Sequence, residues 1–436
     1  MTLLAFRPIT LTSFDVPGDF LAVSVLRWPQ SNTVISGLPD LTFHQTRSLN
    51  YTGTGQGLSK WAKINPSDGV YNWGELDTWV AAHDAAGRGI SFTMHGCPSW
   101  VAATGIYENV NSSAVIDYGA GSCGPVATAS LGAVATFVEA LINRYNFAAG
   151  GVFGTDATRI KSIQAGNEPL FVNGLNITLN SGYTGTPSGT ITDDTTGHTA
   201  TYSSFNSTTR VLGVTSVNGK FTKGGTVSGS GFSGTIANSA FGLYYQSGFS
   251  TTELAAYVRQ CRLGINAADP NVKLIGPALG YPQVSDGTMA TLYAASDGNG
   301  GTILDHIDWH GYNAYNFYSP FYKGYTSSLG IELLLNRMKA AADIPIAITE
   351  TGVSQAIAQD TDGTLTVRAM ALALAHNVKL INVYSYDAGY FDWTNESLAA
   401  LQRLSSLAGK TVSKVLENSV TGEVHFRLAG GDEVII

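Results

Sequence analysis

The feature of this chain that most restricts its fold is a regular alternation of short apolar runs, rich in β-branched residues, with longer amphipathic segments. Strands joined by helical crossovers pair in parallel, so the alternation predicts βα units. The predicted strands are residues 21–27, 40–49, 89–95, 159–167, 271–277, 303–310, 344–350 and 378–386. The predicted helices are residues 76–87, 127–145, 252–265, 287–296, 330–342, 365–376 and 396–408. Eight units of this kind predict an α/β fold, a (β/α)8 TIM barrel.

Two stretches interrupt the alternation. Residues 173–240, after the fourth predicted strand, are rich in Gly, Ser and Thr and contain short alternating runs such as TRVLGVTSVNG. Their apolar residues favour a small inserted β subdomain over the alternative, a disordered low-complexity loop. Residues 409–436 alternate around glycine turns and predict a C-terminal β-hairpin region, which residues 1–18 join as a terminal β satellite. Residues 19–172 and 241–408 then form the barrel.

The low charge of the chain restricts its partners. Charged residues make up 13% of the sequence and the net charge is -8. A nucleic-acid partner is not expected, because phosphate binding needs clustered Lys and Arg. No apolar stretch is long enough to predict a membrane span, and the N-terminal residues do not resemble a signal peptide. The polar, uncharged loops are typical of a protein that is extracellular or associated with a virion.

The cysteines indicate little. Cys97, Cys123 and Cys261 are too few for a disulfide framework. Cys97 and Cys123 fall within one excursion and are able to pair in an oxidising environment, but the sequence does not supply the geometry.

Two glutamates at predicted strand ends carry the strongest functional signal. Glu168 follows the fourth strand in IKSIQAGNEPL, and Glu350 ends the seventh in IPIAITETGVS. The carboxyl ends of barrel strands meet at one mouth, which is where such barrels place their chemistry. Cleavage of a glycosidic bond needs one acid to protonate the leaving oxygen and one carboxylate at the anomeric carbon. A separation of about 5 to 5.5 Å would predict retention of configuration.

Other polar and aromatic residues are expected at the same mouth. Arg47, His310 and Tyr312 are of the type that would hold Glu350 as a charged carboxylate. His310 also fits a satisfied core histidine, and Glu350 without Glu168 would fit a solvated loop acid. The residues predicted to bind substrate are Arg47, His95, Trp100, Asn167, His310, Tyr312, Tyr315, Tyr386 and Trp393. A metal shared by His95 and His310 is disfavoured because no HxxxH or CxxC run exists, and no cofactor is expected.

Several segments together resemble the clan A glycoside hydrolases, most closely family 39 and related exopolysaccharide endoglycosidases. The segment KWAKINPSDGVYNWGELDTWVAAHDAAG (60–87) has the clan's W..I.P..G.Y.W..LD spacing. The NE, PSW, DWHGYN and ITETG motifs resemble the clan's strand-end motifs, and the resemblance spans most of residues 40–400. It implies Glu168 as acid/base, Glu350 as nucleophile, Asn167 as contact to the sugar 2-hydroxyl and Arg47 beneath the nucleophile. One departure lies at the end of the eighth strand, where the clan usually has a Trp. This chain has Tyr384 or Tyr386 there, and Trp393 comes later.

The resemblance implies a retaining glycosidase that works by double displacement through a glycosyl-enzyme intermediate. Its partner would be a carbohydrate polymer or oligosaccharide, and endo action on a β-linked exopolysaccharide is expected because an inserted subdomain beside a cleft suits a long chain. The alternatives are an exo-acting, β-xylosidase-like glycosidase, a transglycosylase, and a non-catalytic carbohydrate-binding or phage adhesion protein. The oligomeric state is not indicated.

Overall fold

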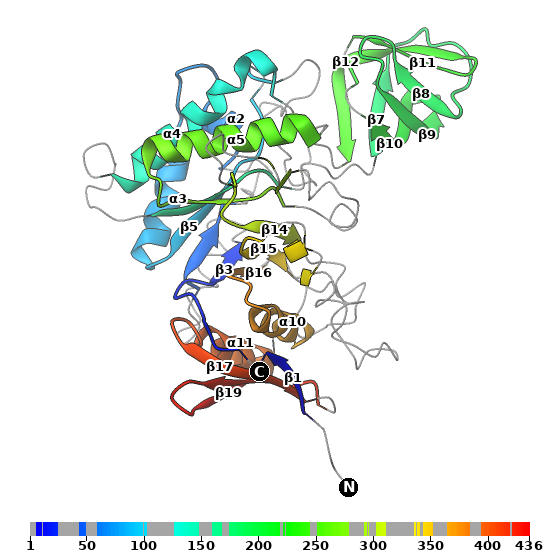
Figure 1. Cartoon of the computed structure of the whole chain (residues 1–436). Helices are drawn as coiled ribbons and strands as arrows, with labels where there is room; N and C mark the ends of the chain where they lie inside the picture. Colours follow the sequence, from blue (N-terminus) through cyan, green and yellow to red (C-terminus); the bar gives the residue numbers. More distant parts are fainter. Residues whose placement is uncertain are drawn as a thin grey trace.

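The computed structural model of the chain contains three β-sheets with helices around the largest of them (Figure 1). It describes residues 6–10, 12–24, 43–48, 59–98, 100–102, 126–147, 159–167, 174–218, 221–222, 224–244, 251–278, 292–293, 295, 302–310, 335–336, 338–340, 343–351, 364–383, 394–418 and 421–436. Among these residues no helix is long and apolar enough to cross a membrane.

The largest sheet has eight parallel strands in the order β13-β6-β5-β4-β3-β16-β15-β14. Their bounds are β3 (Leu21–Ser24), β4 (Gln45–Arg47), β5 (Gly89–Thr93), β6 (Ile160–Gln164), β13 (Lys273–Ile275), β14 (Ile307–His310), β15 (Ile346–Thr351) and β16 (Leu380–Val383). The edge strands β13 and β14 are joined by one parallel bridge, Ile275 to His306, and the Gly276 amide donates to the His306 carbonyl at 2.9 Å. The sheet is thus nearly closed into a barrel, and the predicted fold class is confirmed.

Helices cover the outside of this sheet. The described ones are α2 (Trp61–Ile64), α3 (Gly74–Ala85), the 3₁₀ turn η1 (Thr128–Ser130), α4 (Gly132–Asn146), α5 (Thr251–Ala268), α10 (Thr364–Ala375) and α11 (Asn395–Ser405). Helices α4 and α5 lie against each other (Figure 1), and a Cβ at Gly264 would come within 2.5 Å of the Ala135 carbonyl oxygen. The close approach of the two helices therefore needs glycine at this position. A capping box between Thr394 and Ser397 begins α11.

The insertion after β6 is a small barrel of its own. Its strands are β7 (Gly174–Leu179), β8 (Thr190–Asp193), β9 (Thr199–Asn206), β10 (Val211–Asn218), β11 (Thr226–Gly229) and β12 (Phe232–Tyr244), which close in the antiparallel order β10-β7-β12-β11-β8-β9. Their inward side chains form a separate apolar core, which includes Ile177, Leu212 and Phe232. Gly174 pairs with Tyr244, so the two ends of the insertion are neighbours. The insertion projects away from the parallel barrel (Figure 1) and is not a disordered loop.

The third sheet joins the two ends of the chain. It contains β1 (Phe6–Thr10), β2 (Phe14–Asp15), β17 (Thr411–Asn418), β18 (Val424–Leu428) and β19 (Glu433–Ile435). Strand β17 pairs antiparallel with β1, β2 and β18, and the sheet contacts α10 and α11 (Figure 1). The sequence predicted that residues 1–18 and 409–436 form one β satellite, and in the structure strands from both segments belong to one sheet.

Candidate active site

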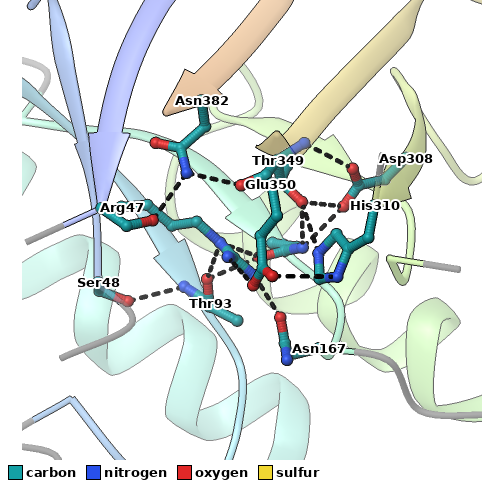
Figure 2. Close-up of polar contacts among 11 residues, drawn as sticks. Arg47, Ser48, Thr93, Asn167, Asp308, His310, Thr349, Glu350 and Asn382 are labelled. Carbon is teal, nitrogen blue, oxygen red and sulfur yellow. Dashed lines mark hydrogen bonds and ion pairs between the residues drawn. The ribbon is translucent and has the colours of Figure 1, made fainter. Parts of the chain in front are cut away.

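A cluster of buried polar side chains lies at the carboxyl ends of the parallel strands (Figure 2). Four of its members are predicted site residues: Arg47 ends β4, Asn167 follows β6, His310 ends β14 and Glu350 lies in β15. The neighbouring strands β14 and β15 place His310 directly opposite Glu350 in register. Parallel pairing thus brings together residues that are far apart in the sequence.

Arg47 is the hub of this cluster. Its guanidinium, 1% exposed, donates from Nη1 to Glu350 Oε1 and from Nη2 to Asn167 Oδ1. Its Nε donates to Gln164 Oε1 at 2.8 Å and to Thr93 Oγ1 at 3.1 Å. An arginine presents its donors in a rigid fork, so these contacts fix the positions of the groups around it. One cation thereby links the polar ends of β6 and β15.

Glu350 is also in contact with a histidine. The carboxylate is 4% exposed, and its Oε2 lies 3.4 Å from Nδ1 of His310. Burial, together with the Arg47 charge, lowers the pKa of His310 to about 3, although the Glu350 charge opposes this shift. The imidazole is therefore neutral at ordinary pH, with a single proton shared between its two nitrogens as alternative tautomers. Among the described residues in this cluster, Arg47 supplies the charge that compensates Glu350.

A lower layer of polar side chains supports these groups. Asp308 Oδ2 lies 2.7 Å from Gln164 Nε2 and 2.8 Å from Thr349 Oγ1, and its Oδ1 accepts from the Thr349 amide at 3.1 Å. Asn382 Nδ2 donates to Ser24 Oγ at 2.7 Å and to the Thr349 carbonyl at 2.6 Å. Burial raises the pKa of Asp308 to about 7, although Arg47 and the hydrogen bonds from Thr349 and Gln164 oppose the shift.

This lower layer was not among the residues predicted from the sequence. The signal that marks it is a polar residue directly beside a large apolar one, as Gln164 after Ile163, Asp308 before Trp309 and Thr349 after Ile348. Such a residue faces the barrel interior when its sequence neighbours pack outward against the helices, because side chains alternate along a strand.

Two further predicted site residues have protein partners in the structure. His95 is 1% exposed, and its Nε2 lies 3.1 Å from Ser59 Oγ; burial, followed by the charges of Lys60 and Arg47, holds its pKa well below the usual value. The indole N–H of Trp100, which is half-buried, donates to the Asn65 carbonyl at 3.0 Å. Contact of either residue with a substrate stays a prediction.

The other predicted site residues lie outside the described residues: Glu168, Tyr312, Tyr315, Tyr386 and Trp393. Cys123 does as well, so the predicted pairing with Cys97 stays untested. Within the described part of the chain, no three His, Cys, Asp or Glu side chains are grouped so that they could hold a metal ion.

Comparison with known proteins establishes the fold. No family model and no curated protein sequence significantly matches the chain. A glucosidase from Croceicoccus marinus has a similar structure, with a TM-score of 0.51 and 12% identity over 98% of this chain and 74% of that chain. The GH39 enzyme from Xanthomonas axonopodis pv. citri gives a TM-score of 0.49 and 12% identity over 95% of this chain and 71% of that chain. The likeness to the Croceicoccus marinus glucosidase supports the barrel fold, and the resemblance to clan A glycoside hydrolases beyond the fold stays a prediction.

Proposed function

We propose that this chain is a retaining glycoside hydrolase with Glu350 as its nucleophile and Glu168 as its acid/base. The observation that carries the proposal is the cradle of Glu350, whose two carboxylate oxygens face Arg47 and His310 at the carboxyl end of a barrel strand. A carboxylate buried to 4% exposure is costly unless it is paired and fixed. A nucleophile needs that fixed orientation, whereas a solvated loop acid does not.

The proposed reaction has two steps. In the first, Glu350 attacks the anomeric carbon while Glu168 protonates the departing glycosidic oxygen. In the second, Glu168 removes a proton from water, which displaces Glu350 and releases the sugar with its configuration retained. Both acids must therefore lie close to one anomeric carbon. Asn167, which precedes Glu168 in the chain, accepts a hydrogen bond from Arg47, which also donates to Glu350.

Asn167 supports a sugar in contact with this site. Its Oδ1 faces Arg47, a group that only donates, so its amide nitrogen must point the other way. That nitrogen, Nδ2, is buried and has no hydrogen-bond partner among the described residues. A buried donor without a partner costs about 1 to 3 kcal/mol, and a substrate hydroxyl would remove that cost. The proposed contact is the sugar 2-hydroxyl.

The proposed substrate is a β-linked exopolysaccharide, cleaved in the endo mode. A polar surface with few charges suits a neutral polymer. The six-stranded barrel is inserted between β6, which carries Asn167 and Glu168 after its end, and α5, and an inserted subdomain near the site suits a long chain. Exo action on short β-xylosides is the alternative. Product size decides between them, since endo cleavage releases oligomers from the outset and exo cleavage releases single sugars.

The test is a panel of polysaccharides assayed for new reducing ends. Glu350→Gln should abolish release, and Glu396→Gln, a matched change of an exposed glutamate in the first turn of α11, should leave the rate unchanged. Azide added to Glu350→Ala should restore bond cleavage and form a glycosyl azide of inverted configuration, because azide replaces the nucleophile. Reducing ends released by Glu350→Gln at the parent rate would show that the assignment is wrong.

A further inference from the structure

A chain of short polar contacts leads from Asp308 to the proposed nucleophile (Figure 2). Asp308 Oδ2 lies 2.8 Å from Thr349 Oγ1, and Thr349 Oγ1 lies 3.2 Å from His310 Nε2. On the other side of the imidazole ring, Nδ1 lies 3.4 Å from Glu350 Oε2. Asp308, Thr349, His310 and Glu350 are all buried. A second carboxyl is thus connected to Glu350 without touching it.

Gln164 limits the possible directions of this chain. Its Oε1 accepts from Arg47 Nε, which fixes the amide orientation because arginine only donates. Its Nε2 therefore faces Asp308 Oδ2 and Thr349 Oγ1 as a donor to both, at 2.7 and 2.8 Å. The single hydroxyl proton of Thr349 then has two acceptors to choose between, Asp308 and His310.

The proton on Asp308 decides that choice. When Asp308 is a carboxylate, the Thr349 hydroxyl donates to it, and the neutral His310 donates from Nε2 to Thr349. The unprotonated Nδ1 of His310 then faces the Glu350 carboxylate. When Asp308 is protonated it donates to Thr349, the Thr349 hydroxyl donates to Nε2 of His310, and the histidine carries its proton on Nδ1, directed at Glu350. No proton is gained or lost at the histidine, which changes only its tautomer.

We propose that Asp308 is a positioning residue whose proton, relayed through the Thr349 hydroxyl, sets the tautomer of His310 and thereby supplies or withdraws a hydrogen bond to Glu350. Protonated Asp308 gives the arrangement in which Arg47 and His310 both donate to Glu350. This role rests on the proposed role of Glu350 as nucleophile, whereas the tautomer of His310 does not depend on any substrate.

The surroundings of Asp308 allow the switch to operate near neutral pH. Among the described residues, the ionisable groups that act on Asp308 are Arg47 and the buried Tyr293. His310 follows Asp308 by two residues in β14, and Glu350 follows Thr349 in the neighbouring strand β15. Burial raises the pKa of Tyr293, the Asp308 charge raises it further, and the phenol stays neutral. Burial raises the pKa of Asp308 to about 7, so both protonation states are reached between pH 5 and pH 9.

The test is ¹⁵N NMR of the histidine side chains in the whole protein between pH 5 and pH 9. The His310 signals are recognised by their loss in His310→Gln among the 8 histidines. In the wild type the protonated nitrogen should change from Nδ1 to Nε2 as the pH rises through about 7. In Asp308→Asn the tautomer of His310 should not depend on pH, because the asparagine amide does not titrate, in either of its two orientations. One constant tautomer in the wild type, or a change that persists in Asp308→Asn, would overturn the proposal.

Two variants of Thr349 separate the relay from a merely structural role. Thr349→Ser keeps the hydroxyl and should keep the tautomer change, whereas Thr349→Val removes it and should abolish the change. With a cleavable glycoside, kcat of Thr349→Val should fall by about ten- to a hundredfold, as expected for the loss of one hydrogen bond to a charged group, with little change in KM. A tautomer change that survives in Thr349→Val would refute the relay. Because the NMR readout needs no turnover, a protein without glycosidase activity would refute the proposed function and leave the relay to be judged separately.

Discussion

Replacing Asp308 by Asn should remove a large pH dependence from the stability of the protein. The carboxyl is fully buried, and burial raises its pKa to about 7 from the ordinary value of 3.8. Between these two pH values the folded protein keeps a proton that the unfolded chain releases. The free energy of unfolding therefore falls by about 1.4 kcal/mol for each pH unit, and above pH 7 it is lower by about 4 kcal/mol than in acid. An asparagine contributes no such term.

The measurement is urea denaturation of the wild type and of Asp308→Asn at pH 5 and pH 8. Over this interval the wild type should lose about 3 kcal/mol more than the variant, and all other ionisable groups cancel in the comparison. Asp305→Asn is the matched control: burial would raise the pKa of Asp305, but the hydrogen bonds from Arg262 and the Leu274 amide lower it below the usual value. That carboxylate is charged at both pH values, so its loss should shift stability equally at each. Parallel pH curves for the wild type and Asp308→Asn would refute the reasoning.

Three further outcomes are expected. Arg47→Met should lower the free energy of unfolding by about 3 to 5 kcal/mol in urea titrations, because it removes the arginine partner of the buried Glu350 carboxylate, and Glu350→Gln in the same chain should recover part of the loss. Exchange of residues 174–244 for a short Gly-Ser linker should leave the parallel barrel folded, as judged by circular dichroism and one cooperative melting transition, because the ends pair and the two cores share no residue. As the pH falls below 6.5, the Tm of His83→Gln should rise relative to that of the wild type, because burial and then Arg88 lower the pKa of His83 to about 3 and the unfolded chain takes up the proton first.

The sequence predicted the parallel barrel because its strands carry a local signal. Runs such as GISFT in β5 and LINV in β16 are short, apolar and rich in β-branched or aromatic residues, as strands buried on both faces require. The strand-end positions of Arg47, His310 and Glu350 followed from the same pattern, because parallel strands deliver their carboxyl ends to one mouth. Their contacts with each other depend on register between strands more than 30 residues apart and have no local signal.

The inserted barrel and the lower polar layer were not predicted in detail for a related reason. Alternating runs between residues 173 and 240 indicate strands, but closure of the six-stranded barrel depends on the pairing of β9 with β10 and of β7 with β12, which alternation does not encode. Asp308 and Thr349 stand in apolar runs and, read alone, fit solvated or hydrogen-bonded core residues equally well. The parallel pairing of the barrel strands brings Gln164 into hydrogen-bond contact with both, and no local pattern in the sequence predicts this contact.

The interior of the parallel barrel therefore has two layers of different chemistry, and their order explains how the site is supported. Inward positions two residues apart on the same strands hold an apolar residue first and a polar one next: Ala22 and Ser24, Ala347 and Thr349, Leu380 and Asn382. The apolar layer, which includes Ala22, Ala347 and Leu380, excludes water from beneath the lower polar layer. Without water each hydrogen bond of the polar layer is stronger, and each lost partner costs more. A barrel filled only with branched apolar residues would be simpler to pack, but it would offer no donors to a buried carboxylate. The polar layer therefore contributes to the orientation of Glu350 more than to net stability, and substitutions within it should change the site before they change the fold.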